Sequence, residues 1–541
     1  MRGRGGGVGM VQRCDLLIRA GTVVDGTGAP GRPADVAIRG DRIAVVGRLE
    51  EWRGEVEVDA SGLAVAPGFI DMHSHSDLAL LVNPNAESKL RQGVTTEVTG
   101  MCGFSPAPAR GEGKDAIREM FGQWGREVEW TWGGFGEYLE ALRSRPASVN
   151  VFPVVGHGII RAGVMGEDDR PPVGQELEAM REAVREAMEE GARGLSTGLV
   201  YAPGMFAKTD EVAALAREIA PFGGIYFSHI RGEADGLLSS IAEAVEVGRQ
   251  AGVPVQIAHL KRDGRRNWGK AGEALAALER ARQEGVEVSY DVYPYTAWNT
   301  GLGQMLPAWV REGGLEAMLG RLRDPATRER IAEELAAAAE GDPGRWGLRM
   351  IAAVETEANR RLQGMTLAGV AEGRGAPPEL VVMDLLVEEG GHVSMVGFGM
   401  DERDVKEIIA HPIGMIGSDA AAVAPYGTLG LGHPHPRSYG TFPRVLGHYV
   451  REEKALSLEA AVAKMTGRPA EKLGLKDRGR VAPGMAADVV VFDPRAIADR
   501  ATYQGPQQYP AGIHYVIVNG VVELEGEEHQ GRHPGRVLAG G

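Results

Sequence analysis

Several side chains that can bind a metal ion stand where a short apolar run ends. Residues 65–70 form such a run, and Asp71-Met72-His73-Ser74-His75 follows it. On extended backbone the two histidines, two residues apart, point to the same side, so both could reach one ion. By itself this spacing is more often a polar loop with two histidines, because short motifs match frequently by chance.

Other potential metal ligands also follow apolar runs farther along the chain, which favours a metal site over a polar loop. Six potential ligands follow apolar runs: His73, His75, Cys102, His229, His259 and Asp419. A lone cysteine would be a small buried hydrophobe. Beside two histidines, however, its thiolate suits a catalytic zinc with three protein ligands and one open position. Next to it, Asp419 could act as general base and then general acid towards water whose pKa the metal lowers to about 7. The set predicts metal-assisted hydrolysis.

The apolar runs alternate with Ala-, Glu- and Arg-rich stretches of helical character. The predicted strands end near His73, Cys102, His157, Val200, His229, His259, Tyr293 and Asp419. Most of the intervals are long enough for one βα unit, which needs roughly 30 residues or more. Eight units predict a (β/α)₈ barrel of the α/β class, in which all strand C-termini meet on one face. A doubly wound sheet would instead place a glycine-rich turn after its first strand.

Both ends of the chain have a different texture, with apolar and polar residues alternating at period two. Residues 15–19, 35–38 and 42–46, and again 487–492 and 515–522, read as short strands. We predict a composite β-sandwich domain from residues 1–64 and 480–541, flanking a barrel at residues 65–479. Residues 300–390, between barrel strands seven and eight, are predicted to be an insertion that covers the active-site face.

Composition excludes several classes of protein. Lys+Arg is 59 and Asp+Glu is 74 among 541 residues, and the net charge of −15 argues against nucleic-acid binding. The only two cysteines, Cys14 and Cys102, exclude a disulfide scaffold and indicate a reducing compartment. The glycine-rich start is no convincing signal peptide, and Met10 is an alternative start. No apolar run is long enough to span a membrane. We expect a cytoplasmic protein, with homo-oligomerisation left open.

At this point the chain resembles the amidohydrolase superfamily, in His73-Ser74-His75, the single histidines after strands five and six, and Ser418-Asp419. Further motifs are similar to those of the D-aminoacylases, the N-acyl-D-amino-acid deacylases. These motifs are Gly100-Met101-Cys102-Gly103, His259-Leu260-Lys261, Asp291-Val292-Tyr293-Pro294-Tyr295 and His433-Pro434-His435-Pro436-Arg437. The resemblance runs over residues 15–522.

The resemblance implies a role for each of these residues. Cys102, His229 and His259 would hold one tight zinc. His73, His75 and Asp419 would form a weaker second metal position or act on the substrate directly, with Asp419 as the general base and acid. The substrate would be an N-acyl-D-amino acid.

Recognition of the substrate can be argued from charge. An acidic protein needs local cations to hold a carboxylate, and Arg437 and Lys261 follow ligand-bearing strands. Tyr293 resembles a family tyrosine that contacts the substrate, and Tyr201 would line a pocket. Asn299 stands where related enzymes tend to carry a serine that binds the carboxylate, and an amide can donate the same hydrogen bond.

Three alternative functions remain compatible with the sequence. A hydantoinase or dihydroorotase typically carries a carboxylated lysine after strand four, yet residues 194–201 contain none and Lys208 lies beyond them. A deacylase for N-acyl-D-glutamate or D-aspartate would need an extra cation, and residues 293–310 contain no Lys or Arg, which favours neutral or apolar side chains. A non-catalytic metal-stabilised scaffold would have no need of Asp419.

Overall fold

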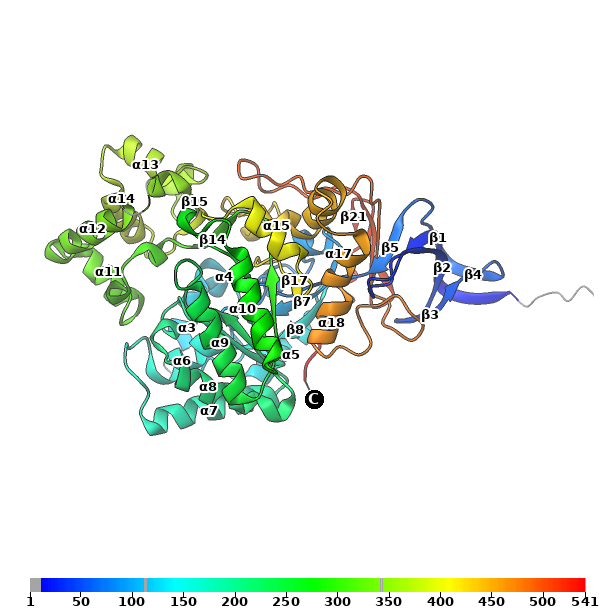
Figure 1. The fold of residues 1–541 in the computed structure, drawn as a ribbon, viewed down its shortest axis with the longest axis horizontal. Coiled ribbons are helices and arrows are strands. Elements are labelled where there is room, and N and C mark those ends of the chain that lie inside the picture. The colour runs from blue at the N-terminus through cyan, green and yellow to red at the C-terminus, as the bar shows by residue number, and fades with distance from the viewer. Residues whose placement is uncertain (1–10, 111–113, 341, 343, 541) are drawn as a thin grey trace, which may run out of the picture.

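The structure is a computed structural model that describes residues 11–110, 114–340, 342 and 344–540. The alternative starts at Met1 and Met10 lie outside this part of the chain. Eight parallel strands follow one another around the centre of the molecule (Figure 1). They are β6 (Phe69–Asp71), β7 (Val94–Thr99), β8 (Asn150–Pro153) with its continuation β9 (Val155–Gly156), β10 (Gly194–Gly198), β11 (Ile225–His229), β12 (Val255–Ile257), β13 (Val288–Val292) and β17 (Gly414–Ile416).

These strands pair in chain order, and β13 pairs with β17 across the long insertion. The N–H of Met72 donates to the carbonyl of Ile416 (3.3 Å), which joins the first strand to the eighth. Every strand residue is buried, as in parallel sheets covered on both faces. The predicted (β/α)₈ barrel is confirmed, and each strand ends within a few residues of its predicted position.

Helices pack around the barrel, most of them with one face buried. They are α1 (Ala79–Val82), α2 (Glu87–Leu90), α3 (Lys114–Met120), α4 (Gly122–Glu127), α5 (Phe135–Ser144), α6 (His157–Met165), α7 (Gly174–Glu189), α8 (Thr209–Ile219), α9 (Leu237–Ala251), α10 (Ala271–Gln283), α15 (Glu402–Ala410), α16 (Arg437–Arg444), α17 (Leu458–Met465) and α18 (Gly467–Lys472). In α8, for example, Val212, Leu215 and Ile219 lie at helical spacing and are fully buried.

Strands from both termini form one nine-stranded sheet at one end of the molecule (Figure 1). Its members are β1 (Gln12–Val23), β2 (Arg32–Arg39), β3 (Arg42–Gly47), β4 (Trp52–Asp59), β5 (Ala64–Pro67), β18 (Val489–Phe492), β19 (Ile513–Val518), β20 (Val521–Glu525) and β21 (Glu528–His529). The two termini meet where β5 pairs antiparallel with β18. Ile18, Val65, Val489 and Ile517 are fully buried in the core that the sheet encloses.

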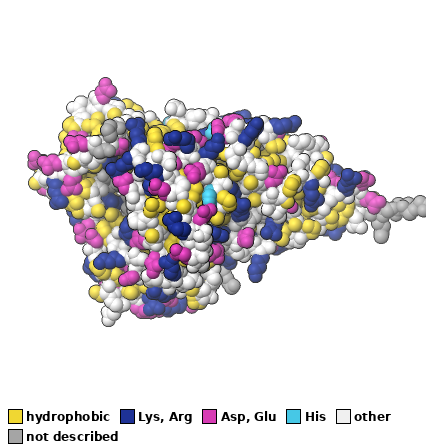
Figure 2. Space-filling model, viewed as in Figure 1, with side chains coloured by type: hydrophobic (Ala, Val, Ile, Leu, Met, Phe, Trp, Pro, Cys, Tyr) yellow, Lys and Arg dark blue, Asp and Glu magenta, His cyan; other side chains and the backbone are white. Residues whose placement is uncertain are grey.

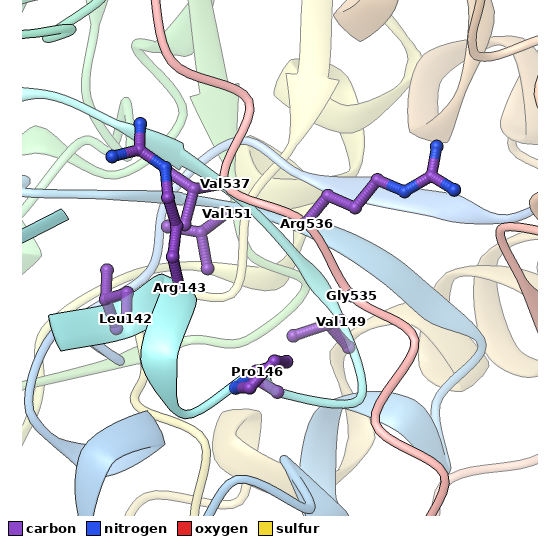
Figure 3. Close-up of a pocket in the computed structure, with 9 residues that line it drawn as sticks. Leu142, Arg143, Pro146, Val149, Val151, Gly535, Arg536 and Val537 are labelled. Atoms are coloured by element: carbon purple, nitrogen blue, oxygen red, sulfur yellow. The ribbon is translucent and has the colours of Figure 1, made fainter. Parts of the chain in front are cut away.

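The last described residues leave this sheet, although the sequence-based boundary placed them in the β domain. The N–H of Val151 in β8 donates to the carbonyl of Arg536 (2.9 Å), and that of Leu538 donates back to Val151 (2.7 Å). The tail therefore lies along the third barrel strand. Figure 3 shows Arg536 and Val537 of this tail beside Val149 and Val151.

Residues 297–398, between β13 and β17, form a lobe of their own at the opposite end from β1–β4 (Figure 1). β14 (Ala297–Gly301), β15 (Arg349–Ala353) and β16 (Ser394–Phe398) make a small antiparallel sheet. Four helices pack on a separate core that includes Leu322 and Leu386. They are α11 (Gly314–Arg323), α12 (Pro325–Glu340), α13 (Leu367–Arg374) and α14 (Pro378–Glu388). The lobe therefore begins and ends slightly outside residues 300–390.

The surface carries both signs of charge. Figure 2 shows Lys and Arg side chains interspersed with Asp and Glu over the visible face. Within the described residues, no helix combines the length and the apolar character that crossing a bilayer requires.

Candidate metal centre and active site

Three of the predicted ligands meet at the C-terminal ends of β7, β11 and β12. Cys102 Sγ lies 3.5 Å from His229 Nδ1 and 3.6 Å from His259 Nε2, and the two nitrogens are 2.9 Å apart. Around a tetrahedral zinc with bonds of about 2.3 Å to sulfur and about 2.0 Å to nitrogen, sulfur and nitrogen would be separated by about 3.5 Å. The thiolate and the two imidazoles therefore fit a zinc ion, with a fourth position left open.

The other three predicted ligands form a second group that shares Cys102. His73 Nε2 lies 3.2 Å from Cys102 Sγ and 3.4 Å from Asp419 Oδ1, and His75 Nε2 lies 3.0 Å from the same oxygen. His73 is fully buried, while the side chain of His75 is 33% exposed. The structure thus brings all six predicted ligands together, in two groups that meet at the sulfur.

Three of these ligands have a backbone conformation with positive φ. Cys102, His259 and Asp419 have φ values of 55°, 36° and 52°, in the left-handed region that side chains other than glycine rarely adopt. Each residue comes just after its strand ends. Such strain costs of order 1–3 kcal/mol per residue and persists only where the surrounding structure imposes it, which is common at functional sites.

Two carboxylates that our sequence analysis did not assign hold the histidine rings from behind. Asp291 Oδ1 lies 3.2 Å from His73 Nδ1, and Glu233 Oε1 lies 3.1 Å from His259 Nδ1. Such partners fix the tautomer and orientation of a metal-binding imidazole. Glu233 follows His229 by four residues, a spacing that could have drawn attention to it.

A buried charged cluster fastens the two turns that carry His73 and Asp419. Asp71 Oδ1 accepts hydrogen bonds from the N–H groups of His73 (3.1 Å) and Ser418 (2.8 Å). Its other oxygen accepts from the Ser418 hydroxyl (2.6 Å) and the Lys89 ammonium (2.7 Å). Lys89 is inaccessible to solvent and also donates to the Ala420 carbonyl (2.8 Å). Lys89 and Asp71 therefore lock the first strand to the eighth below the ligands.

Neighbouring charges and hydrogen bonds lower the pKa values of two of the ligands, Asp419 and Cys102. Burial alone would raise the pKa of Asp419, but Arg437 and the neighbouring histidines hold it well below its usual range. Burial would also raise the pKa of Cys102, and the adjacent His73 and the hydrogen bonds from His229 and His259 lower it instead. Both groups are thus held as anions, the form in which they bind a metal ion.

The two predicted carboxylate-binding cations, Arg437 and Lys261, lie beside one aromatic ring. The guanidinium of Arg437 lies 4.7 Å from the Tyr293 ring centre, and the ammonium of Lys261 lies 5.7 Å from it. Arg437 Nη1 contacts Asp419 Oδ2 at 2.7 Å, and Lys261 contacts Glu233. The Tyr293 hydroxyl is buried and has no hydrogen-bond partner among the described residues.

His435, which the sequence analysis quoted in a motif but gave no role, positions Arg437. Its Nδ1 accepts the backbone N–H of Arg437 (3.0 Å), while its Nε2 donates to the carbonyl of Ala297 (3.0 Å). Burial and the nearby Arg437 charge lower the pKa of His435 well below its usual value. The neutral ring therefore supplies one acceptor and one donor.

The two remaining predicted substrate contacts lie at the mouth of the site. The Tyr201 hydroxyl is 3.2 Å from Thr300 Oγ1, and its ring packs edge-on against His229. The amide of Asn299 donates to Ser394 Oγ (3.0 Å) and to the Met395 carbonyl (2.8 Å) of β16. The backbone carbonyl of Asn299, 3.5 Å from Arg437 Nη2, is what faces the cation.

Two cavities open from the metal ligands, on either side of Asp419 and Tyr201. One, of about 460 Å³, includes Lys261, Arg231 and Arg311. The other, of about 550 Å³, includes Cys102, His75 and Arg437. The absence of Lys and Arg from residues 293–310 was our reason to favour neutral or apolar substrates. Arg311 follows that stretch directly and lies on the cavity wall, so the argument overlooked a cation. A third cavity, of about 300 Å³ at the C-terminal tail, contains none of the predicted ligands (Figure 3).

Lys208, considered for the cyclic-amide alternative, stands at the N-cap of α8 and lines neither of the two cavities at the metal ligands. The residues of β10 are all buried, and none of them is a lysine. Cys102 is the residue that belongs to both ligand groups.

The chain is similar to known proteins over almost its whole length. Residues 56–522 match the amidohydrolase family model. The D-aminoacylase of Alcaligenes xylosoxydans xylosoxydans is 40% identical over 98% of this chain and 98% of its own. A solved D-aminoacylase with a binuclear metal centre is 38% identical, with a TM-score of 0.82 over 97% of this chain and 100% of that one. The N-acyl-D-glutamate deacylase of Bordetella bronchiseptica, solved with zinc and a phosphonate inhibitor, is 36% identical, with a TM-score of 0.83 over 98% and 100%. The resemblance seen in the motifs is confirmed: the chain belongs to the amidohydrolase family, as a metal-binding hydrolase of its D-aminoacylase group.

Proposed function

We propose that this enzyme is a zinc-dependent deacylase of N-acyl-D-amino acids, releasing a carboxylate and a free D-amino acid. The observation that carries the proposal is the thiolate–diimidazole set of Cys102, His229 and His259 beside Asp419 and Arg437. Preference for the D-enantiomer is supported by the names of the relatives. His73, His75 and Asp419 offer a second, weaker metal position that shares Cys102.

The chain's own residues divide the work of amide hydrolysis. When bound, zinc polarises the amide carbonyl and makes water a stronger nucleophile at neutral pH. Asp419 accepts the proton of the attacking water and passes it to the leaving nitrogen. His73 and His75, which contact Asp419, orient its carboxylate.

Substrate binding would itself adjust Asp419. In the structure Arg437 pairs with Asp419 and keeps its proton affinity low. A substrate carboxylate at Arg437 brings a second anion to the same cation, which raises the pKa of Asp419 and makes it a better base. Lys261 and the Tyr293 hydroxyl, which has no hydrogen-bond partner in the part of the chain that the structure describes, complete the carboxylate site.

We propose neutral or apolar side chains for the amino acid, since Leu199, Met205 and Trp298 line the cavity that holds Lys261. A second candidate, an N-acyl-D-glutamate or D-aspartate deacylase, is favoured by Arg311. Its guanidinium donates to the Val200 carbonyl (2.9 Å) and to Gln304 (2.6 Å), and it contacts no carboxylate among the described residues. It could hold a side-chain carboxylate.

One assay tests the activity and separates the two candidates. The zinc-loaded enzyme is given N-acetyl-D-leucine, N-acetyl-L-leucine and N-acetyl-D-glutamate. We expect hydrolysis of the D-leucine substrate and at least a hundredfold lower kcat/KM for its L-enantiomer. A preference for D-glutamate that Arg311→Leu abolishes would establish the second candidate, and no hydrolysis of any of the three would contradict both.

A further inference from the structure

A largely apolar passage leads from the metal ligands to the insertion. The cavity that contains Cys102 and His75 continues into another of about 490 Å³, and the two share Phe104, Met120, Trp124 and Leu431 in their walls. We call the passage that these four side chains line the acyl channel. Each of its two cavities has the size of sites that enclose small organic ligands.

Contacts between the barrel and the insertion border the far end of the acyl channel. Arg126 at the end of α4 pairs with Glu355, just after β15. Glu119 in α3 lies 3.4 Å from His392, just before β16. These charged groups at the rim are paired with one another. The rest of the wall combines His75 and Asp77 with the apolar side chains of Phe104, Met120 and Trp124.

The orientation of the substrate determines which of its parts can enter the channel. The scissile carbonyl must lie beside Cys102 and Asp419, where the two cavities at the metal ligands meet. The cavity on the other side holds Lys261 and the apolar residues that we propose for the amino-acid side chain, Leu199, Met205 and Trp298. Arg437 lines the cavity that contains Cys102, so a carboxylate bound by both Lys261 and Arg437 lies between the two cavities. The acyl group then points towards Phe104 and Trp124.

We infer that the acyl channel receives the acyl chain of the substrate, and that the enzyme prefers medium-length apolar acyl groups, such as octanoyl, to acetyl. This inference rests on the proposed function and deepens it. An acetyl group reaches only the inner end of the channel, whereas a longer chain buries methylenes along its walls. Each methylene fully buried would favour binding about fourfold.

The test is a series of N-acetyl-, N-butanoyl- and N-octanoyl-D-leucine, hydrolysed by the zinc-loaded enzyme. We expect kcat/KM to be at least tenfold higher for the octanoyl than for the acetyl substrate. Octanoate should also inhibit deacetylation at least tenfold more strongly than acetate. Equal or falling kcat/KM along the series would overturn the inference while leaving the deacylase intact. Hydrolysis of no member would instead contradict the proposed function.

Two matched variants locate the effect. Leu431 is 47% exposed, so Leu431→Glu places a charge in the acyl channel with little risk to folding. It should lower the octanoyl-to-acetyl ratio of kcat/KM at least tenfold. Leu238 in α9 is 39% exposed and lines neither cavity of the channel, so Leu238→Glu should keep the wild-type ratio. Equal ratios in the two variants would show that the acyl chain lies elsewhere.

Discussion

Glu233 Oε1 lies 3.1 Å from Nδ1 of His259, whose Nε2 points at the sulfur of Cys102. The carboxylate therefore sets the face that this imidazole turns towards the metal position. It also contacts Lys261, so it connects the ligand set with the residue that we propose for the substrate carboxylate.

The first prediction concerns this carboxylate. Glu233→Gln should weaken zinc binding ten- to a hundredfold, the usual effect of removing the carboxylate behind a ligating histidine. Competition with a fluorescent chelator measures it. Glu279→Gln is the matched control, because Glu279 pairs with His411 at 3.1 Å on the surface. Equal zinc affinity in the two variants would remove Glu233 from the metal site.

The second prediction concerns the buried Lys89. Lys89→Met leaves the carboxylate of Asp71 buried without its cation, and breaking such a pair costs about 3–5 kcal/mol. Chemical denaturation of the zinc-loaded protein should show this loss of unfolding free energy. Lys406→Met, at a solvent-exposed pair with Glu453, should cost at most about 1 kcal/mol. A similar cost for both would mean that Lys89 does not lock the barrel.

The third prediction concerns His435, which acts through Arg437. His435→Ala should raise KM for N-acetyl-D-leucine about tenfold, with a smaller change in kcat, because Arg437 loses its backbone anchor. The same variant should leave KM for N-acetyl-D-leucinamide nearly unchanged, since that substrate has no carboxylate. A loss of equal size with both substrates would point to a general structural role.

The fourth prediction is a pH dependence of stability. Lys464 in α17 donates to the Gly414 carbonyl (3.0 Å), and burial lowers its pKa from 10.5 to about 7. Between pH 7 and 10.5 the unfolded chain holds more protons at this site than the folded one. The contribution to stability therefore rises with pH there, by about 1 kcal/mol per unit. Thermal unfolding at pH 7, 8 and 9 should show wild type gaining on Lys464→Met, and a constant difference would refute the shift.

The sequence could predict those site residues that stand in a recognisable local pattern, directly after an apolar strand. The six ligands were found because each follows an apolar run, and parallel strands bring such positions to one face. The sequence did not predict the roles of Lys89 and Glu233, because neither residue stands at the end of a strand. Lys89 sits on the short helix α2, and only the closure of the barrel brings it to Asp71.

The inserted lobe and the tail show a second limit of the same kind. The helical sequence pattern between Tyr293 and Asp419 predicted an insertion. It did not predict that β14 would bring Asn299 to the site, or that the Asn299 amide would donate its hydrogen bonds to β16. Residues after β21 were placed in the β domain by their position in the chain. Their pairing with Val151 depends on contacts far apart in sequence, which periodicity cannot reveal.

The most direct test of the account is the hydrolysis rate of Asp419→Asn at matched zinc content. The variant keeps Cys102, His229 and His259, so we expect it to retain one tightly bound zinc per chain. Because it can no longer accept the proton of water, kcat for the preferred N-acyl-D-amino acid should fall by about 10²–10⁴-fold. A zinc-loaded variant that hydrolyses the substrate at the wild-type rate would contradict the proposed mechanism.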